Sequence, residues 1–174
     1  MKKILALTLV LVMVAGCGAP TLKMGLGMVS DVSITAAGDK DGSTQVDTTA
    51  CAVTLDANGK IVGISWDVTQ GKAAFDKAGA AKSEPANDIK SKKEIKDGYG
   101  MKKASAIGKE WFEQIDALEK YAVGKTAADV AGMKTMKKDD HHQAVPDVEE
   151  LKSGCTMDVG AFLAAFNKAV ANAK

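Results

Sequence analysis

The sequence predicts an α+β domain in which a small antiparallel β-meander packs against amphipathic helices. Two kinds of periodicity support this fold class. Side chains in residues 26–69 alternate between apolar and polar with a period of two, which is typical of strands. Beyond residue 104 the apolar side chains recur every three or four positions, which is typical of helices. A single sheet with one apolar face needs a covering layer, and these helices supply it.

Three neighbouring strands are expected in residues 26–69. Each presents one face of alternating, mostly apolar side chains: Leu26, Met28, Val32 and Ile34 in the first, Thr49, Cys51, Val53 and Leu55 in the second, and Val62, Ile64, Trp66 and Val68 in the third. The Asn58-Gly59 pair favours a tight hairpin turn between the second and third strands, because both residues tolerate a positive φ.

The covering helices are expected further along the chain. A weak helical pattern covers residues 72–81, and a polar, lysine-rich loop covers residues 82–100. The strongest helical pattern runs over residues 104–122 and stops before Gly124, a residue suited to a helix C-cap.

Two shorter helical patterns follow. Thr126 and Asp129 predict a capping box that opens a short helix ending at residue 131. After a loop at residues 132–147, a last helix is expected over residues 158–172. Its core face consists of five apolar residues: Val159, Phe162, Leu163, Phe166 and Val170.

The start of the chain has the pattern of a secretion signal. Lys2 and Lys3 precede an apolar run at residues 4–14, and small residues precede Cys17. The run is shorter than the roughly 20 apolar residues that span a bilayer. The four residues Val14-Ala15-Gly16-Cys17 resemble a bacterial lipobox.

That resemblance implies that Cys17 becomes an acylated N-terminus, carrying chains such as palmitate, on the extracytoplasmic face of the cell membrane. The expected organisation is a signal peptide at 1–16, a lipidated tether at 17–25 and a single domain at 26–174. Several acyl chains make a firm anchor, since each buried methylene contributes about 0.8 kcal/mol. The alternative is an ordinary secretion signal in which Cys17 stays unmodified.

The composition argues against nucleic acid as a partner. A mature chain that starts at Cys17 has 21 lysines against 22 acidic residues, a net charge of about −1, and it has no arginine. Arginine is the usual residue for bidentate recognition of phosphates and bases. A group of lysines is expected to form solvated surface, with anionic lipid headgroups as the alternative contact: Lys90, Lys92, Lys93, Lys96, Lys102 and Lys103.

The remaining cysteines and the two histidines give weaker signals. Cys51 and Cys155 lie far apart in the sequence, and we expect them to be unpaired, although the predicted location permits a disulfide. His141 and His142 follow two aspartates and could bind a metal. Adjacent histidines seldom reach one ion, so a solvated loop without a metal is the stronger expectation.

The segment before the last helix carries the sharpest site signal. Glu150 is followed by Ser153-Gly154-Cys155-Thr156. This pattern resembles the flavinylation segment of the FMN-binding domain family. There, an acidic residue precedes Ser or Thr, Gly, Ala, and a Thr or Ser that carries FMN through a phosphoester bond. Cys155 stands where that family usually has Ala, and Glu150 stands where Asp is commoner.

The resemblance implies that Thr156 carries a covalent FMN, with Ser153, Gly154 and Cys155 beside it as cofactor-binding residues. Residues 46–69, 98–102 and 121–126 resemble the family more weakly. A helix start also favours phosphate, because its N–H groups are unsatisfied. An apolar wall for the flavin ring is expected from some of Trp111, Tyr99, Met157 and Phe162. The alternative is that Thr156 acts only as the N-cap of the last helix.

These observations predict a membrane-anchored electron carrier outside the cytoplasm. By the resemblance, FMN does the redox work, a flavin transferase attaches it, and redox partners lie in or near the membrane. Such a carrier is not an enzyme with a substrate of its own, and we predict no catalytic residues. The alternative function is a non-redox surface lipoprotein that binds a small ligand, a wall component or a protein partner.

Overall fold

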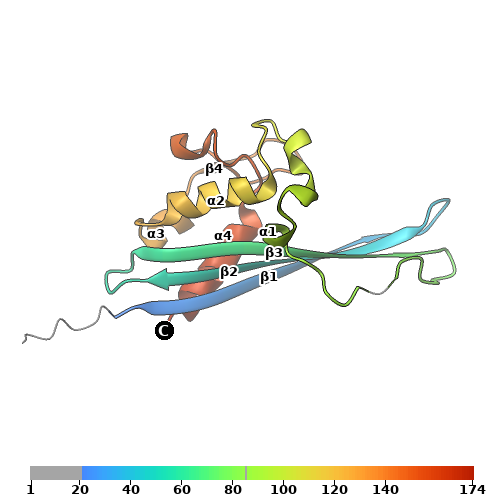
Figure 1. Cartoon of the computed structure of the whole chain (residues 1–174), viewed down its shortest axis with the longest axis horizontal. Coiled ribbons are helices and arrows are strands. Elements are labelled where there is room, and N and C mark those ends of the chain that lie inside the picture. Colours follow the sequence, from blue (N-terminus) through green and yellow to red (C-terminus); the bar gives the residue numbers. More distant parts are fainter. Residues whose placement is uncertain (1–20, 85) are drawn as a thin grey trace, which may run out of the picture.

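A three-stranded antiparallel sheet forms one layer of the domain, and the helices form the other (Figure 1). The computed structural model describes residues 21–84 and 86–174. The predicted signal peptide and Cys17 lie outside the described residues. The α+β class and the meander are therefore confirmed within these ranges. No helix in the described part of the chain is long and apolar enough to cross a membrane.

The sheet consists of β1 (Lys23–Thr35), β2 (Gly42–Leu55) and β3 (Ile61–Phe75), hydrogen-bonded in the order β1-β2-β3. β1 begins inside the segment predicted as a tether, at Lys23. The hairpin between β2 and β3 turns at Gly59, which has φ 75°, as the Asn58-Gly59 pair predicts. Cys51 and Val53 of β2 are buried beneath the helices.

The face of β1 that alternates in the sequence is the face without helices. Met24, Leu26 and Met28 are exposed, whereas Gly27 on the opposite face is buried. A Cβ on Gly27 would overlap the backbone of Ala165 in the last helix. The strand therefore presents glycine to the helix because the helix packs directly on its backbone.

A bulge changes the face predicted for β3. The pairing shifts between Thr54 and Leu55, where Gly63 pairs with Thr54 and Ile61 pairs with Leu55. Ile61 is consequently buried and Val62 is exposed, so Val62 does not join Trp66 and Val68 in the core. One extra residue in a strand reverses the side that its neighbours face.

The weak helix predicted at residues 72–81 is wrong, because β3 continues through Phe75 and then turns back. Asp76 Oδ1 accepts hydrogen bonds from the N–H groups of Ala78 and Ala80, and Gly79 has φ 84°. An aspartate that binds nearby backbone groups competes with helix formation. The predicted loop that follows contains α1 (Lys92–Ile95). Ser91 and Glu94 form a capping box at the start of this helix.

The main helix, α2 (Trp111–Ala122), begins later than its apolar pattern predicts. Residues 104–110 form turns instead, with Gly108 at φ 63°, and short 3₁₀ turns at Lys96–Tyr99 and Met101–Lys103 precede them. The predicted end is confirmed, since Val123 is the C-cap and Gly124 has φ 85°.

The remaining elements complete the helical layer. Thr126 and Asp129 form the predicted capping box of α3 (Ala127–Ala131). Two short strands, β4 (Thr135–Met136) and β5 (Val145–Pro146), pair within the predicted loop. A 3₁₀ turn at Glu149–Leu151 leads to α4 (Gly160–Asn172). Two tilted aromatic pairs contribute to the core: Trp66 with Phe166 joins β3 to α4, and Trp111 with Phe162 joins α2 to α4.

Candidate functional site

Thr156 does not cap α4. The helix begins at Gly160, four positions after Thr156, and Val159 occupies the N-cap position. Asp158 satisfies the first turn instead: its Oδ1 accepts from the Gly160 N–H at 2.8 Å, and its Oδ2 accepts from the Ala144 N–H at 2.8 Å. The alternative role of Thr156 as a helix cap is therefore wrong. A phosphate on Thr156 would also not be stabilised by the N–H groups at the start of α4, because the Asp158 carboxylate already lies there.

The backbone at Thr156 is held by a buried amide on α2. The Thr156 N–H donates to Oε1 of Gln114 at 2.9 Å. Gln114 is fully buried, and its Nε2 donates to Oγ of Ser105 at 3.1 Å and to the carbonyl of Lys109 at 3.4 Å. Among the described residues, no hydrogen bond involves the Thr156 hydroxyl. The hydroxyl is thus free at a position that the rest of the fold fixes.

The predicted segment lies between two different hollows of the surface. Thr156 lines a cavity of about 530 Å³ between α2, α4 and the sheet. Glu150, Ser153 and Gly154 line a separate, open hollow of about 810 Å³ along the other side of α2. Cys155 is completely buried between them. The structure therefore separates Thr156 from Ser153 and Gly154, which were predicted to share one cofactor site.

The cavity at Thr156 has an apolar wall. Trp111, Phe162, Met101 and Met157 line it together with Thr156. The Trp111 and Phe162 rings stand 6.1 Å apart between centroids and are tilted, an arrangement that aromatic pairs favour. Three of the four predicted wall residues are therefore in place.

Tyr99, the fourth predicted wall residue, lies behind a lysine at the edge of the cavity. The Nζ of Lys92 lies 4.7 Å from the Tyr99 ring centroid and 5.6 Å from that of Trp111. Lys92 also lines the cavity, so a positive charge stands beside its aromatic wall. Lys92 is one of the lysines predicted to form solvated surface, but its ammonium packs against two aromatic rings at the cavity.

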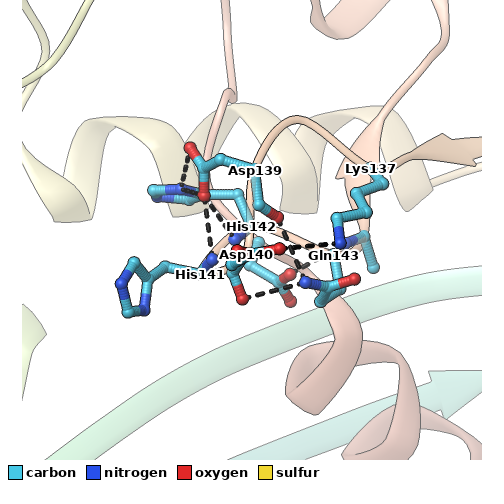
Figure 2. Close-up of polar contacts among 8 residues, drawn as sticks. Lys137, Asp139, Asp140, His141, His142 and Gln143 are labelled. Carbon is cyan, nitrogen blue, oxygen red and sulfur yellow. Dashed lines mark hydrogen bonds and ion pairs between the residues drawn. The ribbon is translucent and has the colours of Figure 1, made fainter.

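The loop between β4 and β5 forms the polar side of the same cavity through His141 and His142. Asp139 Oδ1 accepts from the backbone N–H groups of both histidines at 2.9 Å and lies 2.7 Å from Nδ1 of His142 (Figure 2). Hydrogen bonding from His142 lowers the pKa of Asp139. The His141 ring points away from that carboxylate, so the two rings do not converge (Figure 2).

Lys137 pairs with Asp140 in the same loop at 2.9 Å (Figure 2). Within residues 21–84 and 86–174, no group of three or more histidine, cysteine or acidic side chains is arranged to hold a metal ion. The loop is thus organised by its own ion pairs and backbone contacts.

Both described cysteines are free and buried. Burial raises the pKa of the Cys155 thiol to about 11, and burial together with the charge of Glu119 raises the pKa of Cys51 to about 12. Neither side chain is an exposed thiolate near neutral pH. Cys155 therefore packs as a small apolar group.

Two buried polar residues that the sequence analysis did not single out build the site. Gln114 fixes the backbone of Thr156, and Glu110 fixes the backbone of Met101, which lines the same cavity. The carboxylate of Glu110 is 3% exposed and accepts from the N–H groups of Met101 and Lys102 at 2.8 and 3.0 Å. Both residues fall within the predicted helical stretch at 104–122, where a polar side chain gives no sign of a tertiary partner.

A comparison with curated proteins found a relative that is named as a reductase. The chain is similar to a chlorophenol reductase from Desulfitobacterium hafniense, with 37% identity over 124 residues. The match covers 64% of this chain and 37% of the relative, so the chain spans little more than a third of that protein. No family model matches the chain. No solved structure matches it either.

The relative corrects one prediction. We expected a protein that is not an enzyme, and the finding contradicts this, because the relative is named as a reductase and a reductase is an enzyme. The redox character of the predicted function agrees with that name. FMN attachment, the lipid anchor and membership of the FMN-binding domain family stay predictions.

Proposed function

We propose that the chain is a redox protein that works in a reductase and carries FMN covalently at Thr156. One observation supports this most directly: Thr156, whose hydroxyl has no hydrogen-bond partner among the described residues, lines a cavity that Trp111 and Phe162 also line. A hydroxyl of this kind is what a phosphoester bond to FMN requires. The similarity to a named reductase supports the redox part of the proposal.

The cavity fits a flavin in size, and its lining combines apolar with polar residues. Its volume of about 530 Å³ lies within the roughly 300–1,000 Å³ typical of small-molecule sites. Trp111, Phe162 and Met157 offer apolar surface to a planar ring. Lys92 and Lys138 bring positive charge to the same cavity, where a phosphate would need it.

The acidic residues of the lining are largely engaged elsewhere. Asp158 accepts two backbone hydrogen bonds, as described above. Asp47 accepts from the side-chain amides of Gln45 and Gln70 at 2.8 and 2.7 Å. Asp31, at the far rim, is the third carboxylate of the lining. These hydrogen bonds leave the negative charges in place, so the lining holds three carboxylates against two lysines, and a bound phosphate would have to lie on the side of Lys92 and Lys138.

Bound FMN would supply the electron transfer that a reductase requires. The chain's own residues would orient it: Gln114 fixes the backbone at the attachment residue, and Trp111 and Phe162 keep water from one side of the ring. A flavin transferase and redox partners in or near the membrane belong to this proposal. A chlorinated phenol is the first substrate class to test, because of the relative's name.

We also propose that Cys17 is acylated and anchors the protein outside the cytoplasm. β1 begins at Lys23, only six residues further on. An extended chain covers at most about 3.6 Å per residue, so the sheet would lie within about 20 Å of the lipid end. The redox site would then stay close to partners in the membrane.

The test is the intact mass of residues 18–174 produced in a periplasm together with a flavin transferase. We expect an FMN-sized addition on the parent and on Thr156→Ser, which keeps a hydroxyl, and no addition on Thr156→Ala. Thr44→Ala is the matched control, because this half-buried threonine lies on the sheet away from the cavity. It should carry the same addition as the parent.

Two results would contradict the proposal. A folded parent without the addition would remove the covalent FMN, and an addition that survives Thr156→Ala would remove Thr156 as its site. The reductase role is tested separately, by adding a chlorinated phenol to the chemically reduced, flavinylated protein without oxygen. Reoxidation of the flavin absorbance supports that substrate class, and a stable reduced spectrum argues against it.

A further inference from the structure

One face of the sheet carries almost no charge although it lacks a helical cover. In the antiparallel register, the even-numbered residues of β1 and β2 share this face, and none of them between 24 and 54 within the strands is charged. Their neighbours on β3 add one charge, Asp67, whose Oδ1 accepts from the N–H of Lys93. A sheet face in water is usually polar, so this face is unusual for a free surface.

Large apolar side chains form a ridge along the outer strand of this face. Met24, Leu26 and Met28 are 68%, 56% and 50% exposed, and further along β1 Val32 and Ile34 are 62% and 72% exposed. Exposed edge strands in soluble proteins commonly carry charged residues that discourage association. The ridge lacks them, and contiguous apolar surface of this kind marks an interaction site.

A trough of small residues runs beside the ridge. On β2 and β3 the same face carries Ala50, Ala52, Gly63 and Ser65. In the strand register, Ala50 and Ala52 pair with ridge residues of β1, and Ser65 and Gly63 pair with residues of β2. Together with the ridge these strands enclose an open hollow of about 610 Å³. We call the ridge and the trough together the open sheet face. The trough lies beside the Met24–Met28 part of the ridge, and this part of the face is therefore self-complementary in shape.

The edge of β1 beside the ridge is already occupied. The carbonyl of Leu26 accepts from Nδ2 of Asn172 at 3.0 Å, and the carbonyl of Met28 accepts from Nζ of Lys168 at 2.9 Å. The backbone of Met24 exchanges hydrogen bonds with Lys174 at 3.1 and 3.2 Å. A partner therefore cannot extend the sheet at these residues, and it must approach the face.

Hydroxyl groups at the middle of the face are paired with each other. Ser30 Oγ and Thr48 Oγ1 lie 2.9 Å apart in a hydrogen bond across the two strands. Covering them with another sheet would not leave these groups unpaired, which lowers the cost of removing water. The other end of the face, around Val46 and Gly71, is already partly covered, because Ile89 lies over Gly71.

From this geometry we propose that a second copy of the chain covers the open sheet face. A two-fold axis midway between two sheets and parallel to their strands places β1 of one copy over β3 of its partner. Each ridge then lies in the other copy's trough, and the same residues contact each other twice. Two sheets stacked in this way pack about 10 Å apart.

The features of the face favour this partner over a lipid surface. Membrane-binding faces combine apolar side chains with lysine and interfacial aromatic residues. The residues of the open sheet face include no aromatic side chain, and the ammonium of Lys93 beside the trough is already held by Ser65 Oγ at 3.1 Å and by the carboxylate of Glu119. Its size, about 30 Å along the strands by about 14 Å across them, is at the small end for protein interfaces, so we expect self-association in the micromolar range.

Sedimentation of residues 18–174 tests the proposal, since this fragment contains every described element. We expect a monomer–dimer equilibrium for the parent, and monomers for Leu26→Lys on the ridge and for Ala52→Glu in the trough. Met136→Lys is the matched control, because Met136 is 50% exposed, close to the 56% of Leu26, but lies in the helical layer on β4. It should dimerise like the parent.

Mixing the two interface variants gives a sharper result. A heterodimer of Leu26→Lys with Ala52→Glu places the new lysine near the new glutamate in one contact and keeps the second contact native. We expect dimers in the mixture, identified by native mass, although each variant alone is monomeric. This recovery would not follow from general loss of folding.

Two outcomes would overturn the proposal. One is a parent that stays monomeric at concentrations on the order of 1 mM, where even weak complexes form. In that case, flotation of the parent but not of Leu26→Lys with phosphatidylcholine vesicles would assign the face to a bilayer. The other is a dimer that persists in both variants, which would place the interface elsewhere on the molecule.

Discussion

Thr156 shows how tertiary contacts decide the role of a single residue. A threonine shortly before an apolar helix is a common N-cap, and the local sequence favours that role. Asp158 lies closer to the helix start and accepts the first-turn N–H instead. Gln114, 42 positions away, then fixes the Thr156 backbone. The free hydroxyl is the result of two contacts, one local and one distant, and only the local one could be anticipated from the sequence.

The buried thiols make a residue-scale prediction about alkaline stability. Cys155 and Cys51 have pKa values of about 11 and about 12 in the folded chain, against an ordinary value of 9.0. Above about pH 9 the unfolded chain loses these protons while the folded chain keeps them. Unfolding then releases protons, so the free energy of unfolding falls by about 1.4 kcal/mol per pH unit for each thiol. Urea unfolding between pH 8 and about pH 11 measures the slope.

The control for this prediction is the Cys51→Ala, Cys155→Ala double variant. It loses some stability at every pH, because two buried sulfur atoms are removed. Its slope above pH 9 should be shallower than that of the parent, since the two proteins differ only in these thiols. Equal slopes would mean that the thiols ionise without hindrance in the folded chain.

At the scale of elements, the sequence predicted the regular strands well and the start of the main helix poorly. Alternation and the Asn58-Gly59 turn located the meander, because side-chain period and turn chemistry are local properties. The pattern at residues 104–122 placed the start of α2 too early. Gly108 and the buried carboxylate of Glu110 break the helix there, and the partners of Glu110 lie at residues 101 and 102.

The sequence also left open which face of β1 meets the helices. An apolar alternating face suggests a core, yet Leu26 is exposed and Gly27 is buried. Close packing of α4 on the strand backbone favours glycine, and that preference depends on the approach of a helix more than 130 residues later. For the candidate site, the sequence identified Thr156 and three residues of the cavity wall, but not the separation of Thr156 from Ser153.

Gly27→Ala tests the packing of α4 on β1. A Cβ at this position would overlap backbone atoms of Ala165 and Ala169, which cannot rotate away as a side chain can. Overpacking of this kind costs about 1–3 kcal/mol, and more where backbone must move. We expect Gly27→Ala to lower the free energy of unfolding by at least about 2 kcal/mol in urea titrations.

Gly38→Ala is the matched control for this substitution. A Cβ on Gly38 would have no atom within 4 Å, and the φ of this residue is not positive. Alanine there should change stability by less than about 0.5 kcal/mol, or raise it slightly. If both variants unfolded like the parent, α4 would not pack against the strand backbone as described.

At the scale of the whole molecule, the two halves of the sheet differ in how far the helices cover them. Its proximal half lies under the helices, and the β1–β2 hairpin continues beyond them (Figure 1). The buried residues of the strands are concentrated in the proximal half, as Cys51, Val53 and Trp66 show. Residues 31–35 are all exposed. The redox site proposed at Thr156 borders the proximal half, so the rigid part of the fold supports it.

Hydrogen exchange should separate the two halves. Local opening is easiest where few apolar contacts must break, so we expect amides in residues 43–47 to exchange at least about ten times faster than amides in residues 50–54 of the same strand. Tenfold corresponds to a difference of about 1.4 kcal/mol in opening free energy. Mass spectrometry of peptides from dilute protein measures both segments of β2 in one sample. Residues 50–54 then serve as the internal control for residues 43–47.

Urea gives the second part of this test. Low concentrations should accelerate exchange strongly in residues 50–54, because their opening is global unfolding and exposes the core. The distal segment should respond weakly, because its opening exposes little surface. Equal protection and equal urea dependence in both segments would show that the hairpin beyond the helices opens only with the whole domain, and the sheet would then be one cooperative unit from end to end.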